Sequence, residues 1–512
     1  MICGEKINQE CVFIFAVLLV VSFLLLSNLG NQYLWDDEAQ TALISETILD
    51  HGVPLGYDGK NFFSQELGRE YGEGYVWKWH TWLSFYILAA FFKLFGISTF
   101  TARLPFALFG IGTVLLTYFF ALTLWKSRRI AAIATVFLVF SVPYLLLARQ
   151  CRFYSLAAFF SLLSLYAYLL IIEEKRYAST TFFISTALLF HTHYFYFGAL
   201  ILTCLAHAMV FHKSKVRKLL RLFALLILFN LPWILWFSNI KYGYALTWFN
   251  PAKIIYMAGT FAGHIFLYLF PPAVILITLL AAAVMWFRKK QFKLNKNLET
   301  WRNTVLLIFF FISVLVLLIF LAPGPFFRYL TPLIPVATIL TALILTPLFR
   351  TNLLLGVTAA AFIIFQGPIL NYIYEITHDY DGPIEGIVKY LNQHGKETDT
   401  VAITYGDLPL KFYTKMRVIG GLTGEDLYSA KYSDWVIIRK DVNCPVDFEV
   451  KKYLLETVPW SHYQKIEIDY PDILFENREE LSLHNFKTVN TGDRVVIYKK
   501  RPLPNLLSKT GT

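Results

Sequence analysis

Long stretches without Asp, Glu, Lys or Arg dominate the chain up to about residue 374. A membrane-spanning helix needs ~20 mostly apolar residues. The stretches that meet this requirement are 11–35, 104–125, 130–148, 153–172, 177–211, 222–240, 254–287, 303–327, 329–349 and 351–374. The stretch 177–211 is long enough for two short spans hinged at His191-Thr-His-Tyr194. We therefore predict about eleven transmembrane helices, with the two chain ends on opposite sides of the membrane.

The short loops between these stretches predict the orientation. A cytoplasmic N-terminus places the densest basic clusters inside, at 126–129, 213–221, 288–302 and Arg350, as the positive-inside rule requires. The same choice places residues 28–103 and the acidic tail outside. We expect an integral multi-pass protein of the plasma (inner) membrane, with a cytoplasmic N-terminus and an extracytoplasmic C-terminal domain.

The first outer loop, 28–103, contains patterns of its own. Residues 37–49 carry apolar side chains at helical spacing, and the apolar stretch 80–95 is too short to span comfortably. A span at 80–95 would also move the basic loop 126–129 to the outer side. We expect 80–95 to form a helix in the outer membrane interface.

The tail, 371–512, has a different pattern. Short β-rich runs at 400–404, 435–439 and 495–499 alternate with helical patterns at 384–393 and 408–413. This alternation predicts a small α/β domain. The predicted fold is therefore mainly α, a membrane module of residues 1–370 followed by an extracytoplasmic α/β domain of residues 371–512.

Composition and charge narrow the function classes. Hydrophobic residues make up 56% of the chain and charged residues 16%, against about 25% charged in soluble domains. The net charge of +11 would suit nucleic acid, but residues 1–370 hold 28 Lys and Arg against 14 Asp and Glu, whereas the tail holds 18 against 21. The excess lies on the membrane module, so it indicates topology, and no nucleic-acid partner is expected. The five cysteines form neither a metal-binding spacing nor a disulfide framework.

Ionisable residues gather at the predicted outer ends of the spans. Carboxylates follow the first span in Trp35-Asp36-Asp37-Glu38. One acid there would complement a helix N-terminus, whereas three at a hydrocarbon boundary suit a base or a cation site.

Other outer-face groups suit phosphate or sugar. Arg149 and Arg152 follow the third span, and each is either a phosphate ligand or a snorkelling anchor. Because rings two residues apart on a helix do not point the same way, we expect only one ligand in the pair His191 and His193. The remaining candidates on this face are Lys78, His80, Tyr154, Arg328 and Tyr329. Such a face fits a substrate with a phosphate head and an apolar tail.

Six motifs in chain order resemble those of the polytopic GT-C glycosyltransferases, in the branch of protein O-mannosyltransferases and aminoarabinose transferases. They are Trp35-Asp-Asp-Glu-Ala39 (W-x-D-E-A), Trp79-His-Thr-Trp-Leu83 (H-P-P-L), Phe95-Gly-Ile-Ser98 with Ala102-Arg-Leu-Pro105 (F-G-x-S and A-R-L-P), Ala148-Arg-Gln-Cys-Arg-Phe-Tyr-Ser155 (S-Q-E-A-R-x-Y-S), His191-Thr-His-Tyr194 (T-H-Y) and Arg328-Tyr-Leu-Thr-Pro332 (R-Y-L-x-P). Two departures are that Thr81 and Trp82 replace the prolines of H-P-P-L, and that Gln150-Cys151 lacks the glutamate of Q-E-A-R.

The resemblance implies an inverting transfer of a sugar from a polyprenyl-phosphate carrier to a hydroxyl acceptor, which is a protein, lipid or glycan, on the extracytoplasmic face. It implies that Asp37 is the base with Glu38 in support, and Asp36 is the alternative. Donor phosphate and sugar would contact Arg328 first, then Arg149 and Arg152, with help from Tyr154, Tyr329, Lys78, His80 and His193.

No cofactor is required by the sequence. A divalent cation is compatible with the resemblance because some relatives bind one, and its ligands would come from Asp37, Glu38 and His191. Two rival functions stay open: an oligosaccharide ligase or polymerase with a pyrophosphate-linked donor, and a lipid or solute transporter. The transporter is disfavoured because the spans are nearly free of charge and show no internal repeat.

Overall fold

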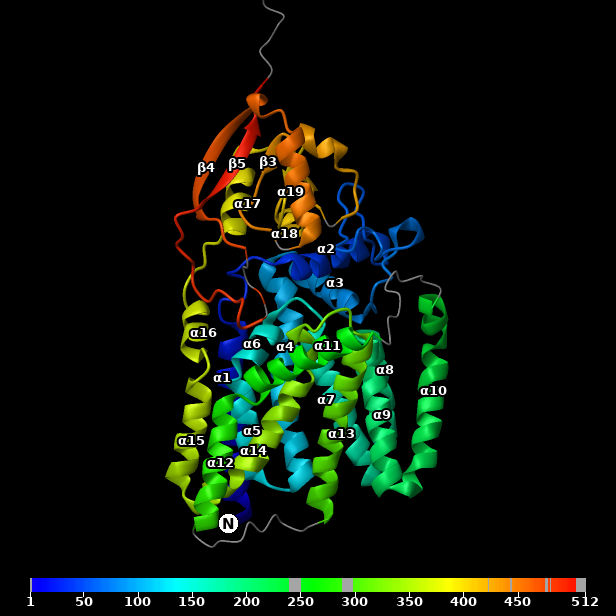
Figure 1. The fold of residues 1–512 in the computed structure, drawn as a ribbon. Coiled ribbons are helices and arrows are strands. Elements are labelled where there is room, and N and C mark those ends of the chain that lie inside the picture. Colours follow the sequence, from blue (N-terminus) through cyan, green and yellow to red (C-terminus); the bar gives the residue numbers. More distant parts are fainter. Residues whose placement is uncertain are drawn as a thin grey trace, which may run out of the picture. The chain divides into compact units, whose positions relative to one another are not determined.

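The computed structural model describes residues 2–238, 250–287, 298–421, 423–442, 444–474, 478 and 480–502. Their contacts divide the chain into two compact units, which we describe separately (Figure 1). The helical unit comprises Met1–Leu29, His80–His378 and Glu479–Ser482. The sheet unit comprises Gly30–Trp79, Asp379–Arg478 and Leu483–Thr512. The first outer loop is thus shared between the two units, a grouping that the local sequence pattern did not predict.

The helical unit is built from consecutive apolar helices. They are α1 (Ile2–Leu26), α3 (Leu83–Phe95), α4 (Thr99–Trp125), α5 (Arg128–Val139), α6 (Val142–Arg149), α7 (Tyr154–Ile172), α8 (Ala178–Thr192), α9 (Tyr194–Phe211), α10 (Lys213–Ser238), α11 (Pro251–His264) with the π-turn Ile265–Leu269, α12 (Pro272–Phe287), α13 (Leu298–Leu321), the 3₁₀ turn Phe327–Leu330, α14 (Leu333–Thr351), α15 (Leu353–Phe365) and α16 (Ile369–Glu375). Helix α4 packs against α5 and α7, α7 against α8, α9 against α13, and α5 against α14 (Figure 1).

Length and composition make eight of the described helices candidate membrane spans. The count rises to ten if two bent pairs each form one span, namely α5 with α6, bent by 64°, and α15 with α16, bent by 55°. The remaining span of the predicted eleven is α8, which is a helix of 15 residues. The stretch 254–287, predicted as one span, contains the two helices α11 and α12.

Breaks in these helices follow from local chemistry. Helix α4 begins after Ser98, whose hydroxyl accepts the Thr101 N–H, and α5 begins after Ser127, which caps in the same way. Pro143 stands near the start of α6, and Gly367 and Pro368 separate α15 from α16, where proline cannot supply the helical N–H. The predicted hinge in 177–211 is present, since α8 and α9 are separated at His193.

The sheet unit contains a five-stranded sheet in the order β2-β1-β3-β5-β4. The strands are β1 (Thr400–Ile403), β2 (Arg417–Ile419), β3 (Trp435–Ile437), β4 (Tyr463–Pro471) and β5 (Arg494–Lys500). Strand β1 pairs in parallel with β2 and β3, whereas β5 pairs antiparallel with β3 and β4. The three predicted β-rich runs correspond to β1, β3 and β5, so the predicted α/β character of the tail is confirmed.

Helices cover both faces of this sheet. The unit's helices are α2 (Asp36–His51), α17 (Pro383–His394), α18 (Asp407–Tyr413) and α19 (Pro445–Thr457), with 3₁₀ turns at Glu73–Tyr75, Leu427–Tyr432 and Trp460–His462. Val401 and Ile403 of β1 pack on the face covered by α17 and α18, while the intervening Ala402 packs on the face covered by α19. This alternation follows from the two-residue period of a strand.

Residues 30–79 are bound to the tail by polar contacts as well as by packing. Helix α2 packs against α18. The buried side-chain amide of Asn61 donates to Met416 O at 3.2 Å and accepts the Val418 N–H at 2.8 Å. The ammonium of Lys411 donates to Phe62 O at 2.8 Å. Asn61 thereby occupies the backbone groups of the edge strand β2.

Candidate functional site

The residues expected to form the site lie in both units. The helical unit holds His80, Arg149, Arg152, Tyr154, His191, His193, Arg328 and Tyr329, and the sheet unit holds Asp36, Asp37, Glu38 and Lys78. We describe the two groups in turn.

His193 is the centre of an aromatic cluster in the helical unit. Its backbone is extended between α8 and α9, and its Nδ1 accepts the Phe195 N–H at 3.4 Å as a cap for α9. The ring centroid of His193 lies 4.8 Å from that of Phe153, 4.9 Å from Tyr196 and 6.2 Å from Tyr329. The helix break that the sequence predicted therefore brings the imidazole among residues of other segments.

The same cluster gathers further predicted residues. The His80 ring lies 6.2 Å from Phe153, which is also 5.0 Å from Tyr154. Arg152 is buried, with its guanidinium 5.9 Å from the Phe153 ring. We call His80, Arg152, Phe153, Tyr154, His193, Tyr196 and Tyr329 the histidine cluster. The sequence had indicated five of these seven residues, because they stand at the ends of different apolar stretches.

The turn before α14 joins this cluster through its backbone. The Tyr196 hydroxyl donates to Tyr329 O at 2.9 Å, which holds the 3₁₀ turn Phe327–Leu330 against α9. Arg328 is partly exposed, and its guanidinium lies 4.3 Å from the Phe326 ring. A cation held over an aromatic face keeps its hydrogen-bond donors at the edge of the guanidinium plane, where they suit an anion.

Arg149 has a different environment. Its guanidinium donates to Ser27 O at 3.0 Å, to Asn28 O at 3.2 Å and to the Tyr372 hydroxyl at 3.3 Å. The Tyr372 hydroxyl in turn donates to Leu24 O at 2.7 Å. Arg149 thus satisfies carbonyl groups beyond the end of α1, as buried helix ends require. These contacts indicate that Arg149 has a structural role.

The neighbours of His191 are different residues. Its ring lies 5.5 Å from Trp233 and its side chain hydrogen-bonds with Asn230. His191 belongs to the helical unit, whereas Asp37 and Glu38 belong to the sheet unit. Among the described residues, no three His, Cys, Asp or Glu side chains come together as a metal site.

The three carboxylates of the sheet unit form the first turn of α2, which spans Asp36–His51 where the sequence predicted a helical pattern over 37–49. Trp35 precedes this turn and supplies no side-chain cap, so the acids themselves complement the exposed N–H groups. Asp37 and Glu38 are buried, and Asp36 is partly exposed as a residue although its Oδ1 is buried.

The pKa of Asp36 is raised to about 7. Burial of the carboxylate is the main cause, Arg478 works against it, and the neighbouring acids Asp407, Asp447 and Asp37 add to it. A carboxyl group with a pKa near neutrality can both take up and release a proton at physiological pH.

A second cluster beside Asp36 was not predicted. Arg478 lies with its guanidinium 4.5 Å from the Trp35 ring and donates to the Tyr405 hydroxyl at 2.8 Å. The buried Arg439 pairs with Asp472 at 2.7 Å and lies 5.9 Å from the Tyr405 ring. Tyr405 and Arg439 follow the parallel strands β1 and β3, and the carboxyl ends of such strands are the usual place for a ligand. That strand signal was present in the sequence, whereas nothing local distinguished Arg478.

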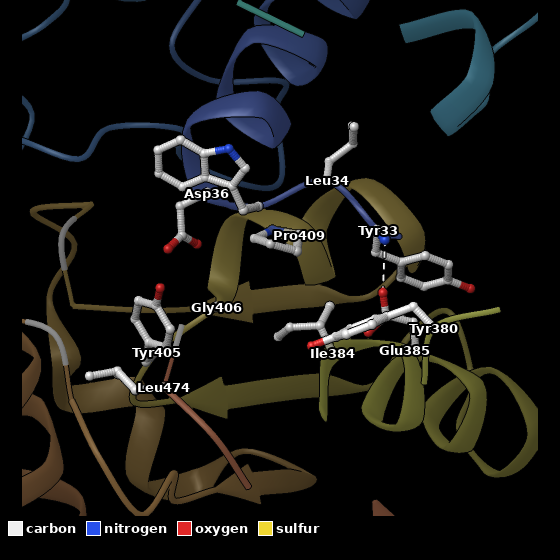
Figure 2. A pocket seen from close by; sticks show the side chains of 11 residues that line it. Tyr33, Leu34, Asp36, Tyr380, Ile384, Glu385, Tyr405, Gly406, Pro409 and Leu474 are labelled. Atoms are coloured by element: carbon white, nitrogen blue, oxygen red, sulfur yellow. Dashed lines mark hydrogen bonds between the residues drawn. The ribbon is translucent and has the colours of Figure 1, made fainter. Parts of the chain in front are cut away.

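These residues border a small hollow that is partly open to solvent. We call it the sheet-unit pocket (Figure 2). It is lined by Tyr33, Leu34, Trp35, Asp36, Tyr380, Ile384, Glu385, Tyr405, Gly406, Pro409 and Leu474. Figure 2 shows the carboxylate of Asp36 and the hydroxyl of Tyr405 pointing toward one another.

Lys78 lies elsewhere in the sheet unit. Its N–H donates to Glu70 O at 2.7 Å, next to the β-bridge between Tyr71 and Trp77. Its side chain passes directly over Gly72, where a Cβ would lie 2.8 Å from Lys78 Nζ. Lys78 does not line the sheet-unit pocket.

Comparisons with known proteins show the fold. No protein-family model matches the chain, and no curated protein matches it in sequence. The crystal structure of ArnT from Cupriavidus metallidurans bound to undecaprenyl phosphate has a TM-score of 0.59 at 13% identity, covering 96% of this chain and 98% of ArnT. The apo form of the same protein gives a TM-score of 0.55 at 12% identity over the same shares.

A mycobacterial arabinofuranosyltransferase, AftD, gives a TM-score of 0.44 at 12% identity, and this chain spans 42% of its length. The two ArnT structures, by contrast, match over nearly the whole of both chains. The chain is an integral membrane protein with the GT-C fold, which it shares with ArnT over almost its entire length.

Proposed function

We propose that the protein transfers a sugar from a polyprenyl-phosphate carrier to a hydroxyl group of an acceptor on the extracytoplasmic face. The observation that carries this proposal is the histidine cluster, which gathers basic and aromatic side chains within a fold shared with an undecaprenyl-phosphate-bound protein. An amphiphilic donor needs apolar surroundings for its tail and fixed donors for its phosphate, and apolar helices that end in basic and aromatic side chains support such a donor.

The reaction exchanges one C–O bond for another. The acceptor oxygen attacks the anomeric carbon, the bond from that carbon to the phosphate oxygen breaks, and the acceptor proton passes to a carboxylate. Attack from the face opposite the leaving phosphate inverts the configuration. The phosphate leaves with additional negative charge, so its stabilisation lowers the barrier.

For the phosphate we assign Arg328 first and Arg152 second. Arg328 is partly exposed and carried by a turn, and Arg152 is buried beside the histidine cluster. His80, His193, Tyr154, Tyr329 and Lys78 are proposed to contact the phosphate or the sugar. Arg149 is reassigned to positioning, because its described donors are directed at two backbone carbonyls and a tyrosine hydroxyl.

For the base we propose Asp37 with Glu38 in support, and Asp36 as the alternative. All three lie in the first turn of α2, where the helix N-terminus stabilises a carboxylate. The raised pKa of Asp36, about 7, allows that residue to take up a proton at neutral pH. Asp37 is buried, so an acceptor would reach its carboxylate only if the first turn of α2 moved.

The test uses the purified full-length protein in lipid nanodiscs. Polyprenyl phosphates that carry radiolabelled hexoses or pentoses serve as donors, and membranes of the native host supply the acceptor. We expect Asp37→Asn to lower transfer by at least ~100-fold, with expression unchanged. Asp50→Asn, which removes an exposed acid from the same helix, is the matched control.

Retained transfer in Asp37→Asn combined with loss in Asp36→Asn would move the base to Asp36. Transfer from pyrophosphate-linked donors only would replace the proposal by a ligase or polymerase. Absence of transfer from every donor, with measured lipid or solute translocation, would contradict an enzymatic function.

A further inference from the structure

Helix α10 lies at the edge of the helical unit, where it packs against α8 and α9 (Figure 1). Its buried side chains recur at intervals of four and three residues, so they share one face of the helix. The Phe223 ring on this face lies 5.9 Å from that of Phe182 in α8. The residues of this inner face are Leu219, Phe223, Leu226 and Asn230.

The opposite face carries a stripe of exposed residues with the same spacing. Two arginines come first, and an alanine and three leucines follow. Leu228 is 64% exposed within the chain, although leucine side chains are usually buried in a soluble protein. We call this set the α10 stripe, and it consists of Arg217, Arg221, Ala224, Leu228, Leu231 and Leu235. The outer side of the helix thus joins a cationic end to an apolar run.

The beginning of α10 is strongly basic. Like charges four residues apart repel each other along a helix, as Arg217 and Arg221 do here. Within the described part of the chain, no carboxylate forms an ion pair with either of these two arginines, whereas Lys215 pairs with Glu174. The basic residues of this segment, with no acid among them, are Lys213, Lys215, Arg217, Lys218 and Arg221.

Other cations near this end of the helical unit have acidic partners. Lys126 contacts Glu173 at 3.0 Å, and Arg128 contacts Glu10 at 2.7 Å. Glu173 stands next to Glu174, the acid that pairs with α10, so these ion pairs lie near its beginning. An anion for the two arginines of the α10 stripe would have to come from outside the described residues, and a phosphate suits the donors of a guanidinium group.

The α10 stripe has the dimensions of a lipid. One leaflet is half of the ~30 Å hydrocarbon core, about 15 Å, which corresponds to about ten helical residues. The distance along the helix from Arg221 to Leu231 spans the same number of positions. Guanidinium groups at the head of the stripe would meet a phosphate at the leaflet surface, and the leucines would meet acyl chains below it.

We propose that the α10 stripe is a binding site for an anionic glycerophospholipid. The guanidinium groups of Arg217 and Arg221 hold the phosphodiester, and the acyl chains lie along Ala224, Leu228 and Leu231. The excess positive charge disfavours headgroups that carry an ammonium group, so the occupant has a net negative charge.

This site is separate from the proposed donor site. The histidine cluster gathers at the start of α7, whereas the acids beside α10 follow the end of α7, so the two sites lie at opposite ends of that helix. The α10 stripe begins at the end that the sequence predicts to be cytoplasmic. Its occupancy does not depend on the proposed sugar transfer.

The experiment measures lipid binding directly. Native mass spectrometry of the delipidated full-length protein in detergent counts bound lipids and gives the Kd of the first one. We expect dioleoyl phosphatidylglycerol to bind at least ~10-fold more tightly than dioleoyl phosphatidylethanolamine, and than glycerol 3-phosphate, which lacks the tails. The double variant Arg217→Gln and Arg221→Gln should weaken phosphatidylglycerol binding by about 10- to 30-fold.

The matched control is the double variant Lys126→Gln and Arg128→Gln, which removes the same charge from cations that already have carboxylate partners. Its first phosphatidylglycerol should bind within ~3-fold of the parent. A measurement on the unaltered protein avoids any effect of the variants on folding. Phosphatidylglycerol with a diazirine in its acyl chain, crosslinked in nanodiscs and mapped by peptide sequencing, should label residues 224–235.

Four results would overturn the proposal. They are equal binding of the two phospholipids, equal phosphatidylglycerol binding by the arginine variant and the matched control, binding of glycerol 3-phosphate as tight as that of the lipid, and crosslinks that omit α10. Displacement of the first phosphatidylglycerol by an equal amount of undecaprenyl phosphate would place that lipid in the donor site, and this result would also overturn the proposal.

Discussion

Replacing Arg149 by alanine removes a guanidinium whose hydrogen bonds, within the described part of the chain, all go to the protein itself. One nitrogen serves Ser27 O and Asn28 O, and the other contacts the Tyr372 hydroxyl, over whose ring the guanidinium carbon lies at 5.7 Å. The side chain is buried. The variant therefore leaves two carbonyl groups short of a donor at the end of α1.

The magnitude follows from these contacts. A hydrogen bond to a charged group contributes about 1.5–3 kcal/mol, and a buried carbonyl left without a partner costs about 1–3 kcal/mol. We count the two hydrogen bonds of Arg149 Nη2 as one strong bond and the 3.3 Å contact with the Tyr372 hydroxyl as a weak one. On this basis we expect Arg149→Ala to destabilise the helical unit by about 3–5 kcal/mol. Tyr372→Phe loses the weaker contact and its bond to Leu24 O, and we expect about 1–2 kcal/mol.

The assay compares stability with lipid-phosphate binding. Thermal unfolding in nanodiscs at one fixed scan rate should shift downward by about 5 °C or more in Arg149→Ala, while the Kd for undecaprenyl phosphate changes less than ~3-fold. Arg328→Ala should show the opposite pattern, with a Kd at least ~10-fold weaker and little change in unfolding. The double variant of Arg149 and Tyr372 should be less than additive by about 1 kcal/mol. An Arg149→Ala protein that unfolds normally and binds undecaprenyl phosphate poorly would refute the structural assignment.

Three further predictions concern the sheet unit. The folded pKa of Asp36, about 7, lies above its unfolded value, so the folded state holds an extra proton and the free energy of unfolding falls as pH rises from about 4 to 7, by up to ~1.4 kcal/mol per pH unit. Asp36→Asn should remove this pH dependence from the free energy of unfolding measured across the same range. An unchanged pH dependence would contradict the prediction. Gly420→Ala should lower the free energy of unfolding by about 3 kcal/mol or more, because its Cβ would collide with the Asp407 carboxyl group, which forms a buried ion pair with Lys411. Gly492 has open space around it, so Gly492→Ala should be nearly neutral when unfolding is measured in the same way. Arg439→Met should cost about 3–5 kcal/mol because it leaves the buried Asp472 carboxylate without its counter-ion, and a melting temperature equal to that of the parent would argue against this.

Local patterns were sufficient for most of the helical unit. Long apolar stretches predicted its helices, and the polar residues inside 177–211 predicted the break at His193. The stretch 254–287 was predicted to hold one span, whereas Pro271 and Pro272 separate α11 from α12 within it, because proline interrupts a helix. The gathering of His80, Arg152, His193 and Tyr329 was also foreseen, since all stand at matching ends of apolar stretches.

The sheet unit was harder to predict. Strand β2 has three residues, and β4 alternates charged side chains with apolar ones on a largely exposed surface, so neither differs clearly from a loop. The union of residues 30–79 with the tail depends on contacts between segments more than 300 positions apart, such as Asn61 with Val418. The sheet-unit pocket is formed by segments that are far apart in the sequence, and therefore no local motif predicted it.

The contact of Asn61 with β2 has a consequence for the order of synthesis. Asn61 leaves the ribosome long before Met416 and Val418, whose backbone groups it will occupy across 355 and 357 positions. At a translation rate of ~5–20 residues per second, roughly 18 to 70 seconds separate the two events. During that interval residues 30–79 lack the backbone groups that Asn61 contacts in the folded protein. Once the tail has been made, Asn61 hydrogen-bonds with the edge strand β2, whose unpaired backbone groups could otherwise pair with another chain. A ribosome stalled before β1 would therefore leave residues 30–79 without the backbone groups that Asn61 contacts in the longer chain.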